Sequence, residues 1–176
     1  MTRKKLFLGA LFLVLSMIFF VGCTGNSTDN GSNQSQEPVQ EQLSEEAIQV
    51  VLYFADQEAE YLNRVEREIE EQEDLIRALF EELKKPGEYG AVLPTDAELI
   101  DYTIEGKILS LNFNEGFANL GGSASEFLAI NAIVNTFTEL PDYDAVSFYV
   151  ENEMLETGHN AYDQPVTRNE NAIQFQ

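Results

Sequence analysis

The sequence predicts an α+β fold, with a small sheet of about four to five strands and two helices packed on one face of that sheet. Three observations predict this class. Several short segments alternate apolar and polar residues, two longer segments repeat apolar residues every three to four positions, and the two kinds follow one another as strand, helix, hairpin, helix and strand. Hydrophobic residues make up 44% of the 176 residues, which is enough for a core and excludes wholesale disorder.

The folded part is expected to begin with two strands. Residues 48–54 have a period of two and carry one strongly apolar face, made of Ile48, Val50, Leu52 and Phe54. Residues 61–69 follow a polar turn, and their alternating charges fit either a second, weaker strand or the front of a long helix. We favour the strand.

Two helices and a hairpin are predicted next. Residues 71–84 place apolar side chains on one helical stripe, with acids at the start, lysines at the end and Pro86-Gly87 as the stop. Strands over 98–104 and 107–114 meet at Glu105-Gly106, a tight hairpin signal. A second helix opens at Ser123, which we expect to be the N-cap of a capping box with Glu126. Its expected buried stripe is Phe127, Ile130, Val134 and Phe137.

The end of the chain carries one more strong strand. Residues 145–151 point Val146, Phe148 and Val150 to one side. The tail beyond them holds few aliphatic residues, so we expect an ordered loop and then a frayed end over 171–176. Neither an internal repeat nor a second domain is visible, which predicts one domain over residues 46–170.

The first 22 residues are predicted to be a signal peptide. Arg3, Lys4 and Lys5 precede an apolar run over 6–21, and Cys23, the only cysteine, follows Gly22. This arrangement resembles the bacterial lipoprotein signal, in which the cysteine is lipidated and becomes the new N-terminus. A membrane-spanning anchor is the alternative, but the run is near the lower length limit for crossing a bilayer. We therefore expect a lipid on Cys23, attachment to the cell membrane and a domain on its extracytoplasmic face.

Residues 23–45 are predicted to form the lipidated cysteine and a flexible polar linker. Between Thr24 and Ser44 only Val39 and Leu43 are aliphatic, so the segment cannot bury enough surface to offset its ordering entropy. A flexible chain of about twenty residues would hold the domain roughly 25 Å from the bilayer.

The charge balance restricts the partners. Ten Lys+Arg stand against 31 Asp+Glu, for a net charge of −21, which excludes a general nucleic-acid binder. Removal of residues 1–22 would leave seven basic residues and a net charge of −24. Anionic headgroups repel such a domain, so the lipid on Cys23, and not the protein surface, would hold it at the membrane. One cysteine and one histidine also exclude a disulfide framework and a zinc site, and we expect neither a metal nor a cofactor.

Five short phrases in the folded part, taken in order, carry a family resemblance. They are residues 51–54 (VLYF), 92–96 (VLPTD), 104–112 (IEGKILSLN), 122–126 (GSASE) followed by 133–141 (IVNTFTELP), and a closing phrase of Gly158-His159, Asp163 and 165–169 (PVTRN). In this order the phrases resemble the GerMN domain of sporulation and spore-germination proteins. The resemblance covers about residues 47–170.

The resemblance implies an extracytoplasmic module without known catalytic residues. It also implies a fold similar to the ring-building motifs of secretion-type assemblies. Members of the family take part in assembling the complex between mother cell and forespore, or in cortex formation and germination. A Gly usually follows the last strand of the domain, where this chain has Glu151-Asn152-Glu153.

The residues that could carry catalysis or bind a metal do not form a convincing set. His159 and Asp163 are four residues apart, but no second histidine completes a zinc site. The acids between Glu66 and Asp74 lack the Asp-x-Asp-x-Asp-Gly pattern of a calcium loop, and a solvated charged face explains them better. We therefore expect no enzyme. The alternative is a cell-wall-facing carbohydrate-binding protein or hydrolase, which a deep pocket with two convergent acids of raised pKa would favour.

Four residues are the candidate interaction surface for extracytoplasmic protein partners or for self-association. Tyr53 and Tyr149 project opposite to the core residues of their strands, so we expect them on the open face of the sheet, where they either form an interaction surface or take part in cross-strand packing within the sheet. Thr136 and Thr138 are poor helix formers in mid-helix. They either bond back to a carbonyl one turn earlier or lie on an exposed face used by a partner.

Overall fold

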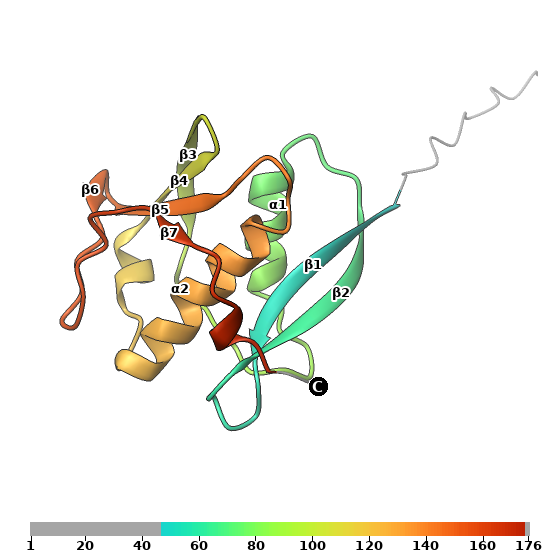
Figure 1. The fold of residues 1–176 in the computed structure, drawn as a ribbon, viewed down its shortest axis with the longest axis horizontal. Coiled ribbons are helices and arrows are strands. Elements are labelled where there is room, and N and C mark those ends of the chain that lie inside the picture. The colour runs from blue at the N-terminus through green and yellow to red at the C-terminus, as the bar shows by residue number, and fades with distance from the viewer. Residues whose placement is uncertain (1–46, 175–176) are drawn as a thin grey trace, which may run out of the picture. The chain divides into compact units, whose positions relative to one another are not determined.

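Two sheets and two α-helices make up the part of the chain that the computed structural model describes, residues 47–174 (Figure 1). The elements are β1 (Ala47–Ala55), β2 (Leu62–Glu70), α1 (Leu75–Leu83), β3 (Leu99–Glu105), β4 (Ile108–Phe113), the 3-10 turn η1 (Glu115–Ala118), α2 (Ser123–Phe137), β5 (Ala145–Val150), β6 (Glu153–Met154), β7 (Val166–Thr167) and the 3-10 turn η2 (Glu170–Ala172). Within 47–174, no helix is long and apolar enough to cross a bilayer. The predicted signal peptide, Cys23 and the linker lie outside the described residues.

The strands form one mixed sheet of five and one antiparallel pair. The larger sheet has the order β3–β4–β5–β6, with β7 also paired to β5, and β4 runs parallel to β5. Among the strands, β1 and β2 pair only with each other, from Ala47 opposite Glu70 to Ala55 opposite Leu62. The α+β class, the sheet of about five strands and the strand at β2 are confirmed. The separation of β1 and β2 into a sheet of their own is a difference from the single sheet that the sequence suggested.

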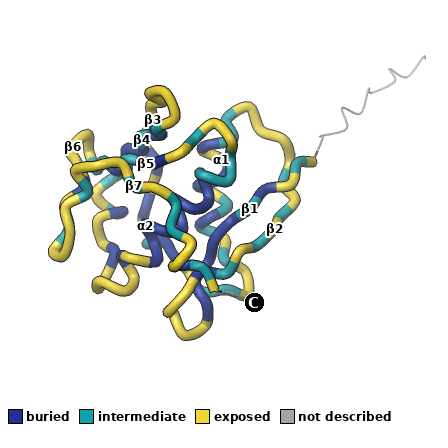
Figure 2. Tube along the Cα trace, viewed as in Figure 1, coloured by how far each residue is buried: buried dark blue, intermediate teal, exposed yellow. Residues whose placement is uncertain are grey.

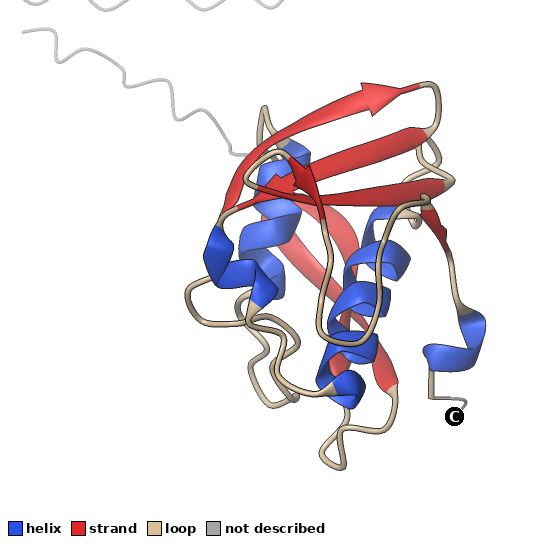
Figure 3. Ribbon diagram, turned by 90° about the vertical axis from the view of Figure 1, so that its left-hand side faces the viewer, coloured by secondary structure: helices blue, strands red, loops and turns tan. Residues whose placement is uncertain are grey.

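The helices lie on one side of the five-stranded sheet, and its other side bears no helix of the described chain (Figure 3). Leu109, Leu111 and Phe113 of β4 point to the helix side and are fully buried. Phe148 of β5 joins them, and Phe117 stacks on Phe113 with ring centroids 4.0 Å apart. β1 packs against both α1 and α2 and is buried on both of its faces in its second half. The core therefore extends from the sheet through the helices to β1.

Helix α1 begins at Leu75, four residues later than the predicted start at 71. The reason is a local cap: the Asp74 side chain accepts a hydrogen bond from the backbone N–H of Arg77 (3.0 Å), which defines Asp74 as the N-cap. The predicted apolar stripe is confirmed, since Ile76, Leu79 and Leu83 are buried with Phe80 between them.

Helix α2 departs from the prediction at its first turn. Gly122 is the N-cap, it makes no side-chain capping bond, and Ser123 is already helical. The predicted capping box is wrong because the Glu126 side chain accepts hydrogen bonds from Asn160 and Tyr162 instead. Phe127, predicted to be buried, is 43% exposed, whereas the rest of the predicted stripe is buried. Most of α2 is buried on every side, so the spacing of its apolar residues does not show which side of the helix faces the core.

The turn after β5 uses left-handed backbone without glycine. Glu151 and Asn152 have φ values of 51° and 69° at the place where the resemblance described above implies a Gly. Asn112 holds this turn: its Oδ1 accepts from the backbone N–H of Asn152 (2.9 Å), and its Nδ2 donates to the Asn152 side chain (3.1 Å). These bonds stabilise a backbone conformation that costs about 1 kcal/mol or more for a residue with a side chain.

The chain end folds back onto the domain. Ala172 is fully buried, and the backbone N–H of Gln174 donates to the carbonyl of Leu62 at the start of β2 (2.9 Å). Figure 2 shows the end of the described chain beside the β1–β2 hairpin. The predicted fraying from residue 171 is therefore wrong for 171–174, because this segment completes the core beside β2. Residues 175–176 lie outside the described residues.

Candidate functional site

Tyr53 does not lie on an open face, as predicted, but is fully buried. It does project from the side of β1 opposite to Leu52 and Phe54, and that side is covered by the end of α2 and by the C-terminal segment. The phenol donates a hydrogen bond to Glu139 Oε1 (2.5 Å) and accepts one from Arg168 Nη2 (2.7 Å). A tyrosine enclosed in this way cannot contact a partner itself and can only stabilise the residues that cover it.

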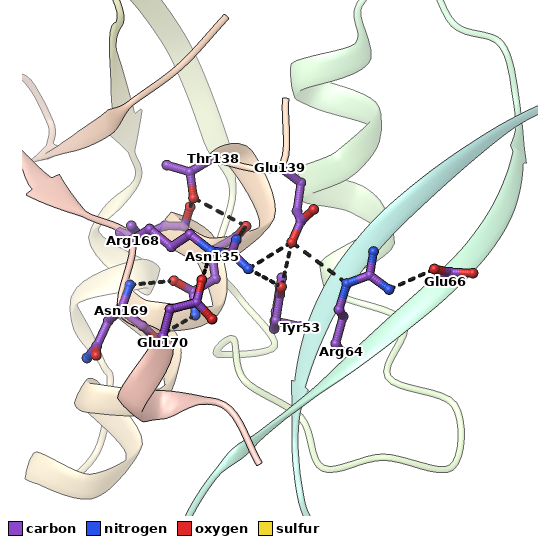
Figure 4. A network of polar contacts seen from close by, with 10 residues as sticks. Tyr53, Arg64, Glu66, Asn135, Thr138, Glu139, Arg168, Asn169 and Glu170 are labelled. Atoms are coloured by element: carbon purple, nitrogen blue, oxygen red, sulfur yellow. Dashed lines mark hydrogen bonds and ion pairs between the residues drawn. The ribbon is translucent and has the colours of Figure 1, made fainter. Parts of the chain in front are cut away.

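Tyr53, Asn135, Glu139 and Arg168 form a polar cluster, called here the Arg168 cluster (Figure 4). The guanidinium of Arg168 lies 2.9 Å from Glu139, donates to the backbone carbonyl of Asn135 (3.1 Å) and stands over the Tyr53 ring at 5.4 Å. It also forms an ion pair with Glu170. One arginine therefore connects β1, the end of α2 and the C-terminal segment.

The surroundings of Tyr53 and Arg168 raise the pKa of both groups. Burial, and then the hydrogen bond to Glu139, raises the pKa of Tyr53 above its ordinary value, so the phenol remains a donor. Burial alone would lower the pKa of Arg168, but its bonds to Glu170 and Tyr53 outweigh this and raise it. Tyr53 and Arg168 therefore keep their protons near pH 7, which suits a structural role better than acid–base catalysis.

Asn135 was missed by the sequence reasoning. It is completely buried in α2, where its Nδ2 donates to the carbonyl of Asn169 (3.1 Å) and its Oδ1 accepts from the Asn169 N–H (2.9 Å). Asn131, four residues earlier, is also buried and donates to the carbonyl of Phe127 (2.7 Å). Two asparagines one turn apart in an otherwise apolar helix are the signal that could have indicated a backbone segment packed along this side of α2.

The two threonines of the predicted surface have different roles. Thr138 bonds back to the carbonyl of Val134 through its hydroxyl (2.7 Å), which confirms one of the two readings of that residue. Thr136 is only 1% exposed, so it cannot belong to a partner-binding surface. Among the described residues, its hydroxyl has no hydrogen-bond partner.

A second buried carboxylate, Glu126, holds the loop between β6 and β7. Only 1% of it is exposed, and it accepts hydrogen bonds from the Asn160 amide (2.8 Å) and the Tyr162 hydroxyl (2.7 Å). Burial alone would raise the pKa of Glu126, but the bonds from Asn160, Tyr162 and Thr157 lower it below the ordinary value. A general acid needs the opposite shift, so Glu126 is unsuited to the acid role in a hydrolase.

Tyr149 does lie on the helix-free face of the five-stranded sheet. It is half-buried, and the register places Asn112 of β4 beside it on one side and Met154 of β6 on the other. Ser110 and Ser147 form the next row of the same face. Of the four predicted surface residues, only Tyr149 and the partly covered Thr138 are exposed at all, and the structure does not bring them together on one face.

The surface of the domain is acidic, and its cations are already paired. Each of the seven basic residues beyond residue 22 forms an ion pair; they are Arg64, Arg67, Arg77, Lys84, Lys85, Lys107 and Arg168. A hollow of about 760 Å³ lies between β2 and α1, and six of its eleven lining residues are acids. No three His, Cys, Asp or Glu residues within 47–174 are grouped closely enough to hold a metal ion.

Comparison with known proteins gives one family. The sequence profile of the Germane family, described as sporulation and spore germination, matches residues 51–156. No curated protein matches the chain. Among solved structures, the tandem GerMN domains of the sporulation protein GerM from Bacillus subtilis match with 26% identity and a TM-score of 0.56. That match covers 70% of this chain and 44% of the tandem structure, so the chain spans less than half of that protein's structure.

The first GerMN domain of the same protein matches by itself. Its TM-score is 0.58 with 18% identity, and the match covers 70% of this chain and 98% of that domain. At this identity the likeness concerns the fold alone. The described strands and helices thus correspond to one domain of this kind.

Proposed function

Since this chain belongs to the Germane family of sporulation and spore germination, we propose that it is a lipid-anchored, extracytoplasmic and non-enzymatic protein that assembles with other proteins in one of these two processes. The match over residues 51–156 carries this proposal. The signal-like segment before Cys23 supports the anchor, and the polar stretch after it supports a tether between membrane and domain.

The electrostatics of the domain favour a binding role over catalysis. Within residues 47–174, two carboxyl groups have clearly displaced pKa values, Glu82 and Glu126, and both are displaced downward. Burial would raise the pKa of Glu82, but hydrogen bonds from Lys85 and Arg67 lower it. A wall-facing hydrolase would need one carboxylic acid that stays protonated near neutral pH, so this alternative has no specific observation in its favour.

The test is a clean deletion in the source organism, complemented with the wild type and with Cys23→Ala. Heat-resistant spores and germination are scored for each strain. We expect a spore defect that the lipidated form rescues and that Cys23→Ala does not rescue, because anionic headgroups repel the surface of a domain of this charge. Normal spores in the deletion strain would overturn the proposed function. Equal rescue by Cys23→Ala would overturn the anchor.

A further inference from the structure

Two exposed aromatic side chains from distant parts of the chain share one hollow. Tyr61 ends the turn between β1 and β2 and is 44% exposed, and Phe127 in the first turn of α2 is 43% exposed. Both line a hollow of about 610 Å³, together with Ala124 and Leu128 on the apolar side and with Glu60 and Asn171 at polar positions. Three segments meet there: the β1–β2 turn, the start of α2 and η2.

Two buried acids form hydrogen bonds that order the segments around this hollow. Asp56, which is 8% exposed, accepts hydrogen bonds from the backbone N–H groups of Glu60 (2.8 Å) and Tyr61 (3.3 Å), and its own N–H donates to the carbonyl of Tyr61 (2.9 Å). Glu126 fixes the start of α2 to the following loop beside Phe127. Both rings are therefore presented by backbone that is already ordered, which reduces the entropy lost when a partner binds.

The turn also carries backbone strain next to the exposed ring. Ala59 has a φ of 54°, a left-handed value that costs an alanine about 1 kcal/mol or more. The turn keeps this conformation because the carboxylate of Asp56 and the bond from the N–H of Ala59 to the carbonyl of Asp56 (3.2 Å) over-determine it. The strained conformation of Ala59 is therefore retained in the turn that exposes Tyr61.

We propose that Tyr61 and Phe127 form the docking surface for a protein partner that inserts an aliphatic or aromatic side chain flanked by Lys or Arg. This proposal rests on the proposed function and names the surface and the chemistry of its partner. The apolar lining selects the inserted side chain, and aromatic anchors of this kind dominate binding energy at protein interfaces. Glu58 and Glu60 are exposed on the same turn, so they select the flanking basic residues.

Charge disfavours a second copy of the chain as the occupant. Two copies would bring the same acidic turn together, and all seven basic residues within 47–174 are engaged in ion pairs. The partner must therefore supply its own positive charge. Binding should weaken as ionic strength rises, because the charged groups at the rim remain in contact with solvent.

The experiment uses the full-length chain in the source organism with a photo-crosslinking amino acid at one position. The test position is Phe127, and the control is Met154, which is 55% exposed on the helix-free face of the sheet. We expect a crosslinked product at Phe127, at least tenfold weaker at Met154. In the mapped partner peptide, the crosslinked residue should be apolar with Lys or Arg within two positions.

Three results would overturn the proposal: equal crosslinking at Met154, a product that is a second copy of this chain, or a crosslinked peptide without basic residues. Binding of a glycan is tested separately with chitotetraose and the wild-type protein. Shifts of the Tyr61 and Phe127 ring resonances on its addition would assign the hollow to a carbohydrate and not to a protein.

A functional readout separates this proposal from the proposed function. The double variant Tyr61→Ser and Phe127→Ser is compared with Met154→Ser for rescue of the deletion strain, at equal protein levels on an immunoblot. Rescue by Met154→Ser and loss of rescue with the double variant support the docking surface. Full rescue by the double variant overturns the docking surface and leaves the proposed function standing. Should the double variant fail to accumulate, the crosslinking result decides.

Discussion

Replacing Arg168 with Met should lower the unfolding free energy of the domain by more than is usual for a partly exposed residue. The change keeps an unbranched apolar side chain but removes the guanidinium from Glu139, from the Tyr53 hydroxyl and from the Asn135 carbonyl. Hydrogen bonds to charged groups contribute about 1.5–3 kcal/mol when buried. Since about a quarter of each charged side chain is exposed, we discount this range and expect a loss of about 2 kcal/mol in total.

The matched control is Arg64→Met, because Arg64 also approaches Glu139 but at 3.9 Å and with 43% of its side chain exposed. Exposed ion pairs of this kind contribute less than about 1 kcal/mol, and we expect a loss below about 0.5 kcal/mol. Urea unfolding of the purified protein measures both losses, and thermal unfolding should place the midpoint of Arg168→Met lower by about 6–8 °C.

The two variants together test whether the Arg168 cluster stabilises the contact between β1, the end of α2 and the C-terminal segment. Similar losses from Arg64→Met and Arg168→Met would show that general charge, and not the geometry of the cluster, sets the stability. A loss below about 0.5 kcal/mol from Arg168→Met would refute the reasoning outright. Hydrogen exchange adds a local readout, since residues 166–174 should lose protection in Arg168→Met before the core does.

Three further predictions concern single positions. Glu126→Gln should reduce the loss of unfolding free energy at acid pH, measured by urea unfolding at several pH values. The folded pKa of Glu126 lies below the ordinary 4.5, so the wild type loses stability as pH falls below about that value, and the variant loses less. Glu151→Gly should raise the unfolding free energy by about 0.5–1 kcal/mol by relieving a left-handed residue, whereas Ala78→Gly inside α1 should lower it by about 1 kcal/mol. Thr136→Val should raise the unfolding free energy by up to about 1 kcal/mol, because it removes a buried hydroxyl without a partner among the described residues. A lower unfolding free energy in urea would contradict this account.

The element order could be predicted because it depends on local periodicity. The alternation in β1 and β5 and the stripe of α1 each follow from which residues one element buries. The same reasoning failed where burial depends on a distant segment. Tyr53 has the position of an outward-facing strand residue, and it is buried because the end of α2 and a segment with Arg168, 115 residues later, cover it.

The first turn of α2 shows the same limit in the opposite direction. Phe127 has the spacing of a core residue and Ser123 the spacing of a cap, but the start of the helix lies at the edge of the domain. There Glu126 turns to the loop at Asn160 and leaves Phe127 in contact with solvent. The spacing of residues along one helix does not reveal which of its turns extends beyond the neighbouring elements.

The position of the β1–β2 turn has a mechanical consequence. Residues upstream of Ala47 enter β1 at one end, and the turn that carries Tyr61 begins where β1 ends. A pull between the N-terminal segment and a partner held at Tyr61 therefore acts along β1, over nine residues or roughly 30 Å of extended chain. The covalent backbone of β1 would carry the part of that load that enters at Tyr61. With the anchor and the docking surface proposed above, β1 would thus transmit tension between the anchored end and the bound partner along its own length.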